Sequence, residues 1–462
     1  MEITGFAKSG GVLSKLISLA EDGSLKSDGS GCVMSRGTAR RVRLAGIADL
    51  ADLIEGLRSN EAIALGALRP GLPDQVEIVA KDKVNGAAQP NVIARTGANI
   101  IYPAEQPGLV LLDFDSKGMP SNVVAKLAHL GGCWPALVSV LPDLRTTAHL
   151  TRRSTSAGLF RSDTGAELPG SNGLHIYLLA RDAADSDRFL RTLHARCWLA
   201  GLGWMMVGGG GQLLERSIVD RMVGRPERLV FEGAPLLVPP LRQDDASRRP
   251  VIVHGEPLDT VAVCPPLTIL EKAKLCELLA REVHQLSPES AKARTAFIAK
   301  QAERLVARTG ISAEAASHIV ARQCDGVLLP DMVLAFDDED LTGATVADVL
   351  ADPVRFEGVT LADPLEGPDY GSCKARIMRR ADGTPWIHSF AHGRTVYELR
   401  FDCRTVRMAM ERAADDVVIK TFVKLALIAD LDDNELETLR NLAADRTGIS
   451  KRTIANTLKT AH

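Results

Sequence analysis

The stretch Leu109-Val-Leu-Leu-Asp-Phe-Asp115 says more about the fold than any other part of this 462-residue chain. Its first four residues are apolar and follow a Pro-Gly pair, which is typical of a buried strand entered from a turn. Side chains on a strand alternate between faces, so Asp113 and Asp115 should point the same way while Phe114 points into the core. Polar residues, glycine and proline then end the strand. The sequence therefore predicts two carboxylates on one face, at the carboxyl end of a buried strand.

Two carboxylates this close repel each other, and a divalent cation is the usual way to keep both ionised. A ligand set made only of oxygen atoms favours Mg²⁺ or Mn²⁺ over zinc. An isolated Asp-x-Asp pair is common in proteins, and at this point an exposed strand end with solvated acids is an equal alternative. The rest of the sequence decides between the two.

Two further runs supply a histidine and a third carboxylate. In Gly170-Ser-Asn-Gly-Leu-His-Ile-Tyr177, apolar and polar residues alternate, which predicts a strand with His175 on its less apolar face. In Ser217-Ile-Val-Asp-Arg221, apolar residues lead to Asp220 on a predicted third strand. Guanidinium groups bind phosphate in a bidentate way. Three arginines follow this acid: Arg221, Arg225 and Arg228. Together these runs contain the groups that a two-metal phosphoryl-transfer site needs.

In this order, the runs resemble the motifs of the archaeo-eukaryotic primase superfamily, and in particular the primase–polymerases of plasmids, phages and integrated elements. The stretch Arg153-Ser-Thr-Ser-Ala-Gly158, and the stretch from Asp220 to Pro240, are also similar to that family. The resemblance covers about residues 105–245, near a third of the chain. One departure is Gly173, where relatives often have serine.

The resemblance implies a role for each matching residue. Asp113, Asp115 and Asp220 would bind the catalytic Mg²⁺ or Mn²⁺ ions, and His175 would contact the triphosphate of the incoming nucleotide. Weaker candidates for phosphate or sugar contacts are Ser154, Ser156 and Arg228.

The implied activity is that of a DNA primase/polymerase of a mobile element such as a plasmid, phage or prophage. It would make primers on a single-stranded DNA template from NTPs or dNTPs, by two-metal nucleotidyl transfer. We expect a separate replicative helicase as partner, because the chain contains no Walker A sequence.

Length and composition limit the number of domains and the compartment. The chain is long enough for two to three domains, and a net charge of −3 counts mildly against tight autonomous DNA binding. The eight cysteines are scattered without a Cys-x-x-Cys pair, which argues against a zinc ribbon and a disulfide framework. The start lacks the pattern of a leader, and no apolar run is long enough to cross a bilayer. We therefore expect a cytoplasmic protein without a membrane partner.

The predicted fold class is α+β, with a catalytic core of small, partly antiparallel sheets and flanking helices, because strand–helix–strand connections surround the acidic centre. Four regions are expected: a primase–polymerase catalytic domain over 1–260, a helical connector or accessory domain over 261–355, a β-hairpin module over 356–402 and a C-terminal helical region over 403–462. Within the last region, residues 434–462 predict two short helices, either a simple helical hairpin or a helix-turn-helix.

The hairpin module is predicted from Asp382-Gly383, which stands between runs of alternating apolar residues. Its outline resembles a degenerate form of the small zinc-binding hairpin domain of bacterial primases, without the cysteines. His388 and His392 lie on or beside a hairpin, so we favour a docking or template-contact role over a zinc site. The basic side chains suited to a nucleic-acid backbone are Arg376, Arg379 and Arg380.

Other classes of protein fit parts of the sequence. Haloacid-dehalogenase-like phosphatases share the Asp-x-Asp pair, but they need a small hydroxyl residue where Lys117 stands and a later pair of acids that is not found. A glycosyltransferase could use the same pair, yet it would not explain Asp220 and the arginines after it. A non-catalytic replication initiator or DNA-binding protein would depend on the C-terminal helices.

Overall fold

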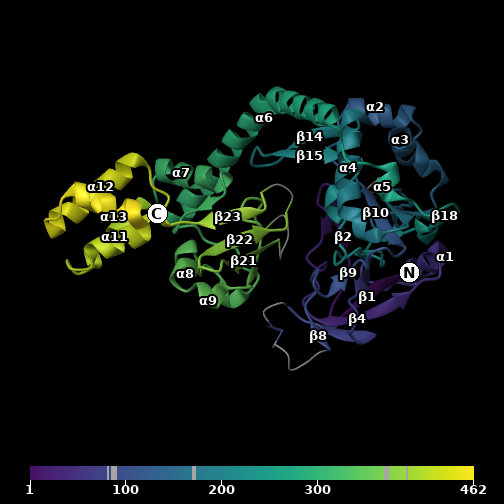
Figure 1. Cartoon of the computed structure of the whole chain (residues 1–462), viewed down its shortest axis with the longest axis horizontal. Coiled ribbons are helices and arrows are strands. Elements are labelled where there is room, and N and C mark those ends of the chain that lie inside the picture. Colours follow the sequence, from purple (N-terminus) through teal and green to yellow (C-terminus); the bar gives the residue numbers. More distant parts are fainter. Residues whose placement is uncertain (81–82, 85–90, 169–172, 369–373, 392–393, 462) are drawn as a thin grey trace. The chain divides into compact units, whose positions relative to one another are not determined.

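A computed structural model describes residues 1–80, 83–84, 91–168, 173–368, 374–391 and 394–461. It is a mixed α+β structure built on several small sheets (Figure 1), so the predicted fold class is confirmed at this level. The chain divides into two compact units. Unit 1 consists of Met1–Met206 and Leu213–Ser287, and unit 2 of Val207–Gln212 and Pro288–His462.

The central sheet of unit 1 is antiparallel, with the strand order β10-β13-β11-β18. Its strands are β10 (Gly108–Phe114), β13 (Leu174–Ala180), β11 (His149–Arg153) and β18 (Val251–Val253). The first five residues of β10 are buried, which confirms the strand predicted from the apolar run.

Helices cover this sheet and share its core. They are α1 (Ile47–Glu55), α2 (Ser121–His129), α3 (Cys133–Val140), α4 (Ser186–Leu199) and α5 (Thr260–Val263). The apolar side chains of α4, including Phe189 and Leu193, belong to the same buried cluster as Leu111 on β10. The burial of this cluster fixes the position of the β10 end.

A second sheet of unit 1 has the order β5-β1-β4-β7-β8. Its strands are β5 (Glu61–Ala64), β1 (Glu2–Lys8), β4 (Gly37–Arg43), β7 (Gln75–Ile78) and β8 (Val92–Ile93). The smaller sheets pair β2 (Leu16–Leu19) with β3 (Leu25–Asp28) and β16 (Leu236–Leu237), β6 (Ala67–Leu68) with β9 (Ile100–Ile101), β12 (Leu159–Arg161) with β17 (Leu241–Gln243), and β14 (Gly203–Val207) with β15 (Leu213–Ser217).

Helix α6 (Ile269–Thr309) has 41 residues and contains Pro288. The side chains of Thr268 and Glu271 satisfy each other's backbone N–H groups and so cap its start. The sequence pattern predicts separate helices over 267–279 and 291–308, and the structure joins them. A proline removes one intrahelical hydrogen bond, but the turns on either side have strong helix formers.

Unit 2 contains a five-stranded sheet with the order β19-β23-β22-β21-β20. Its strands are β19 (Val327–Leu328), β23 (Val396–Leu399), β22 (Pro385–Ser389), β21 (Ala375–Arg379) and β20 (Thr360–Leu361), and the helices beside it are α7 (Ala313–Cys324), α8 (Val346–Ala351) and α9 (Pro353–Phe356). The predicted hairpin is confirmed between β21 and β22, where Gly383 has φ 88° and the Asp382 side chain accepts from the Thr384 N–H.

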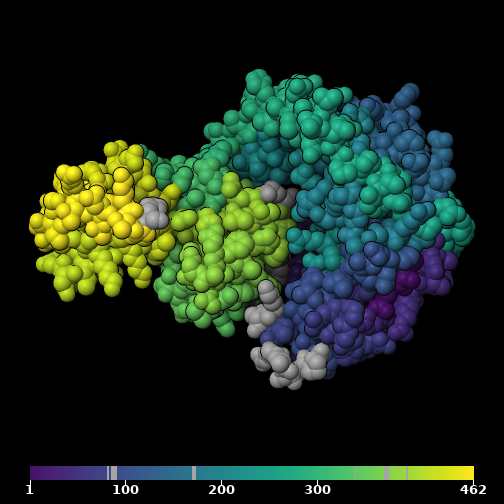
Figure 2. Space-filling model, in the orientation of Figure 1, coloured from purple at the N-terminus to yellow at the C-terminus, as the bar shows by residue number. Residues whose placement is uncertain are grey.

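The end of unit 2, coloured yellow in Figure 2, is helical and has its own apolar cluster. Its helices are α10 (Cys403–Arg412), α11 (Val418–Ala426), α12 (Asp433–Thr447) and α13 (Lys451–Ala461). The two predicted C-terminal helices are confirmed as α12 and α13. Gly448 ends α12 in the left-handed conformation, and the Ser450 hydroxyl accepts from the Thr453 N–H at the start of α13.

Within the described ranges, no single helix has both the length and the apolar character to cross a membrane, although the bent pair α2–α3 passes by length and composition.

Candidate active site

The end of β10 brings an acid and a histidine face to face. In the antiparallel pairing of β10 with β13, Asp113 lies directly opposite His175. Residues opposite each other on adjacent strands share a face of the sheet, and His175 Nε2 is 3.8 Å from Asp113 Oδ1. Phe114 is buried on the other face, as the alternation predicts. The sequence runs that contain Asp113 and His175 therefore meet at the end of β10.

A backbone hydrogen bond holds the third acid, Asp220, beside Asp113. The Asp220 N–H donates to the Asp113 carbonyl oxygen at 3.1 Å. The expectation that Asp220 sits on a third strand is wrong, because β15 ends at Ser217. Asp220 instead caps a short 3-10 helix, Arg221–Val223, and its Oδ1 accepts from the Met222 N–H at 2.8 Å. An aspartate that caps a turn in this way favours a bend over continued extension.

The electrostatics of Asp113 show that the candidate residues act on one another. Burial raises the pKa of the Asp113 carboxyl; the charge of His175 opposes this, the carboxylates of Asp220 and Asp115 add to it, and the Arg228 guanidinium opposes it. The net result is a raised pKa. The Asp113 carboxyl group therefore lies within electrostatic reach of four other candidate residues: His175, Asp220, Asp115 and Arg228.

This donor set fits a hard divalent cation by its chemistry. It consists of carboxylate oxygens, and a bound cation would offset the burial and the two neighbouring carboxylates that raise the pKa of Asp113. Among the described residues, no three His, Cys, Asp or Glu side chains are gathered closely enough to form a metal-binding group.

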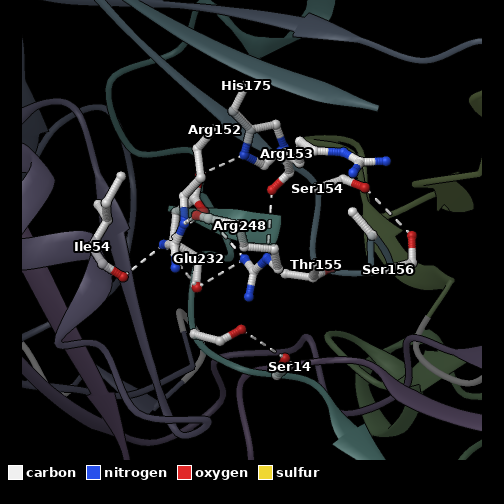
Figure 3. Close-up of polar contacts among 12 residues, drawn as sticks. Ser14, Ile54, Arg152, Arg153, Ser154, Thr155, Ser156, His175, Glu232 and Arg248 are labelled. Carbon is white, nitrogen blue, oxygen red and sulfur yellow. Dashed lines mark hydrogen bonds and ion pairs between the residues drawn. The ribbon is translucent and has the colours of Figure 1, made fainter. Parts of the chain in front are cut away.

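Behind the histidine lies a buried carboxylate that the sequence analysis missed. Glu232 has no solvent exposure, and its Oε1 accepts from His175 Nδ1 and from the Tyr177 hydroxyl, each at 2.6 Å. Its Oε2 accepts from Arg152 Nη1 at 3.1 Å, and Arg248 Nη2 lies 3.5 Å away. Figure 3 shows the two arginines on either side of this carboxylate.

The network favours the protonated form of His175 and sets the direction of its ring. Burial would lower the pKa of His175, but the charge of Glu232, its hydrogen bond and Asp113 raise it. Burial would raise the pKa of Glu232, but His175, Arg152 and the Tyr177 hydroxyl lower it. Because Nδ1 is bound to Glu232, the ring presents Nε2 to the acids.

A sequence signal for this network exists. Arg152 follows Leu150 on the buried face of β11, and Glu232 follows an apolar run. Charges of opposite sign placed among buried apolar residues need each other as partners. Arg152 is only 6 % exposed, and its side chain also donates to the carbonyl oxygens of Ile54 and Arg248.

The weaker candidates lie at the edges of the site. Ser154 directly follows β11, its N–H donates to the Gly173 carbonyl oxygen, and its hydroxyl is 3.4 Å from that of Ser156. A Cβ added at Gly173 would lie only 3.2 Å from the Phe114 carbonyl oxygen, so the glycine fits tightly here. Arg228 is exposed and donates to the Met222 carbonyl oxygen at 3.1 Å.

In unit 2, two of the three predicted backbone-binding arginines are in ion pairs. Arg379 pairs with Glu357 at 2.8 Å, and Arg380 pairs with Glu398 at 2.5 Å. Arg376 forms no ion pair within the described part of the chain, and its Nε is buried without a hydrogen-bond partner there. His392 and residues 170–172, which were part of the sequence argument, lie outside the described residues.

Comparison of the chain with family models, with curated proteins and with solved structures finds no match.

Proposed function

We propose that this chain is a DNA primase/polymerase of a mobile element such as a plasmid, phage or prophage, which makes primers on a single-stranded DNA template by nucleotidyl transfer. The proposal includes membership of the archaeo-eukaryotic primase superfamily, with a separate helicase as partner. One observation carries it. Three sequence motifs, separated by up to 107 residues between Asp113 and Asp220, converge at the end of one strand, with His175 opposite the first acid.

Asp113, Asp115 and Asp220 would hold the catalytic Mg²⁺ or Mn²⁺. When bound, such ions activate the attacking hydroxyl and stabilise the leaving pyrophosphate. The rest of the chemistry is positioning and charge. His175, held at Nδ1 by Glu232, would donate from Nε2 to a phosphate oxygen of the nucleotide.

The exposed guanidinium of Arg228, which already acts on Asp113, would neutralise phosphate charge at the same place. Ser154 and Ser156 would contact phosphate or sugar from the end of β11. These side chains approach the acids from separate elements, which is the arrangement that orienting a triphosphate requires.

The test is primer synthesis on unprimed single-stranded DNA with labelled NTPs or dNTPs and Mg²⁺ or Mn²⁺. The double substitution Asp113→Ala with Asp115→Ala should abolish the products without unfolding the chain. A matched control removes two exposed carboxylates of α1, Asp52→Ala with Glu55→Ala, and should synthesise normally. Metal-independent products, or full synthesis by the first double variant, would refute the proposal.

A further inference from the structure

An aromatic row crosses the exposed face of the sheet in unit 2. Along β22 the buried positions are Pro385, Ile387 and Ser389, so the alternate side chains share the opposite face. These alternate residues are Trp386, His388 and Phe390. Phe390 follows the strand and continues its pairing, because its N–H donates to the Lys374 carbonyl oxygen.

The three rings contact one another in sequence. The ring centroids of Trp386 and His388 are 5.8 Å apart, and those of His388 and Phe390 are 4.9 Å apart, both in edge-to-face geometry. Each ring therefore holds its neighbour in place. Phe390 is 58 % exposed, and among the described residues it is the only aromatic side chain in the set of exposed large apolar residues. The row is an ordered aromatic surface in contact with solvent.

The same face carries an excess of positive charge. Arg376 on β21 lies opposite His388, and the Arg380 guanidinium stands 5.9 Å from the centre of the Trp386 ring. A single carboxylate, Glu398, serves both Arg380 and Arg400. Arg376 forms no ion pair with a described residue. Among the described residues, the row is therefore bordered by three guanidinium groups and one carboxylate.

We propose that this face binds single-stranded nucleic acid, with unpaired bases stacked on Phe390 and Trp386 and backbone phosphates on Arg376. Every base has a π face that can stack on an aromatic side chain, and arginine neutralises the phosphates between the bases. A duplex hides its base faces inside the helix, so it lacks the complementary surface. The site uses none of the acidic residues of unit 1 and needs no activity there.

The test uses the whole chain, in EDTA and without nucleotides, so that its outcome is independent of nucleotidyl transfer. Binding is measured by the fluorescence anisotropy of labelled oligothymidylate, oligouridylate and a blunt duplex. We expect both single strands to bind, and the duplex to bind at least about tenfold more weakly. Tighter oligothymidylate or tighter oligouridylate binding identifies DNA or RNA as the better ligand. Equal affinity for single strand and duplex would overturn the proposal.

Substitutions then separate stacking from simple apolar contact. Phe390→Leu should weaken oligothymidylate binding about tenfold, whereas Phe390→Trp, which keeps a ring, should preserve it. Val354→Ala removes another exposed apolar side chain of unit 2, 67 % exposed, and should change nothing. Arg376→Gln should lower the dependence of log affinity on log salt by about one. Undiminished binding by a folded Phe390→Leu/Trp386→Leu variant, or an equal loss in Val354→Ala, would refute a stacking site.

Discussion

Replacing Glu232 with glutamine should destabilise unit 1 strongly, although the side chain keeps its size. Both carboxylate oxygens accept hydrogen bonds, Oε1 from His175 and Tyr177 and Oε2 from Arg152, in a fully buried position. In glutamine an NH₂ group replaces one oxygen, so that donors face donors. The loss of charge also leaves buried Arg152 and Arg248 without their counter-ion. Breaking a buried pair on one side typically costs about 3–5 kcal/mol, and we expect a loss of this size.

The assay is urea unfolding followed by tryptophan fluorescence in a Trp386→Phe background. The remaining tryptophans, at positions 134, 198 and 204, all belong to unit 1. A matched control is Glu215→Gln, because Glu215 also accepts from a histidine and an arginine but its side chain is 23 % exposed. We expect the control to lose about 1 kcal/mol. A loss below about 1 kcal/mol for Glu232→Gln, or equal losses in the two variants, would refute the argument from burial.

Three further outcomes follow from the described geometry. The pKa of Asp113 is raised in the folded protein, so its stabilising contribution is present below the unfolded pKa of 3.8 and is lost as the pH rises through the folded pKa. At pH 7 the ionised carboxyl therefore destabilises the fold, and Asp113→Asn should raise the melting temperature of the metal-free protein. Mn²⁺ should then stabilise the wild type more than this variant, and a lower melting temperature for the variant would contradict the reasoning. The pKa of His175 is also raised, so its contribution to stability is complete below the unfolded pKa of 6.5 and is lost as the pH rises through the folded pKa. The urea midpoint should therefore fall over that pH range, and it should fall less steeply in His175→Gln. Gly448→Ala should destabilise the C-terminal helices by about 1 kcal/mol, because Gly448 has φ 69°, and an unchanged thermal transition by circular dichroism would speak against that role.

Local patterns predicted the strand that leads to Asp113, the hairpin at Asp382-Gly383 and the two C-terminal helices. Each depends on alternation, turn chemistry or capping within a few residues. The convergence of Asp113 with His175 could be expected only from the order of the motifs. The register that places the two residues opposite each other comes from the pairing of β10 with β13, which joins positions 62 residues apart in the sequence.

Other features were beyond local reasoning. Glu232 belongs to no motif. Its place after an apolar run signals a charge that needs a partner, but the partners become evident only when β11 and β13 bring Arg152 and His175 to it. Asp220 satisfies the N–H group of Met222, so its position is set by a turn and not by the apolar residues before it. In α6, the helix formers on both sides outweigh the breaking effect expected of Pro288.

The path of the chain through α6 has a practical consequence. The division between the two units falls at Ser287 and Pro288, within this helix, and residues 207–212 belong to unit 2 although the segments on both sides belong to unit 1. No single cut in the polypeptide therefore separates the units. A fragment that ends at residue 287 would lack the C-terminal half of α6. It would also keep residues 207–212 without the rest of unit 2, to which they belong. Each unit is therefore best studied by substitution within the intact chain, because a cut would divide α6 and separate residues 207–212 from the rest of unit 2.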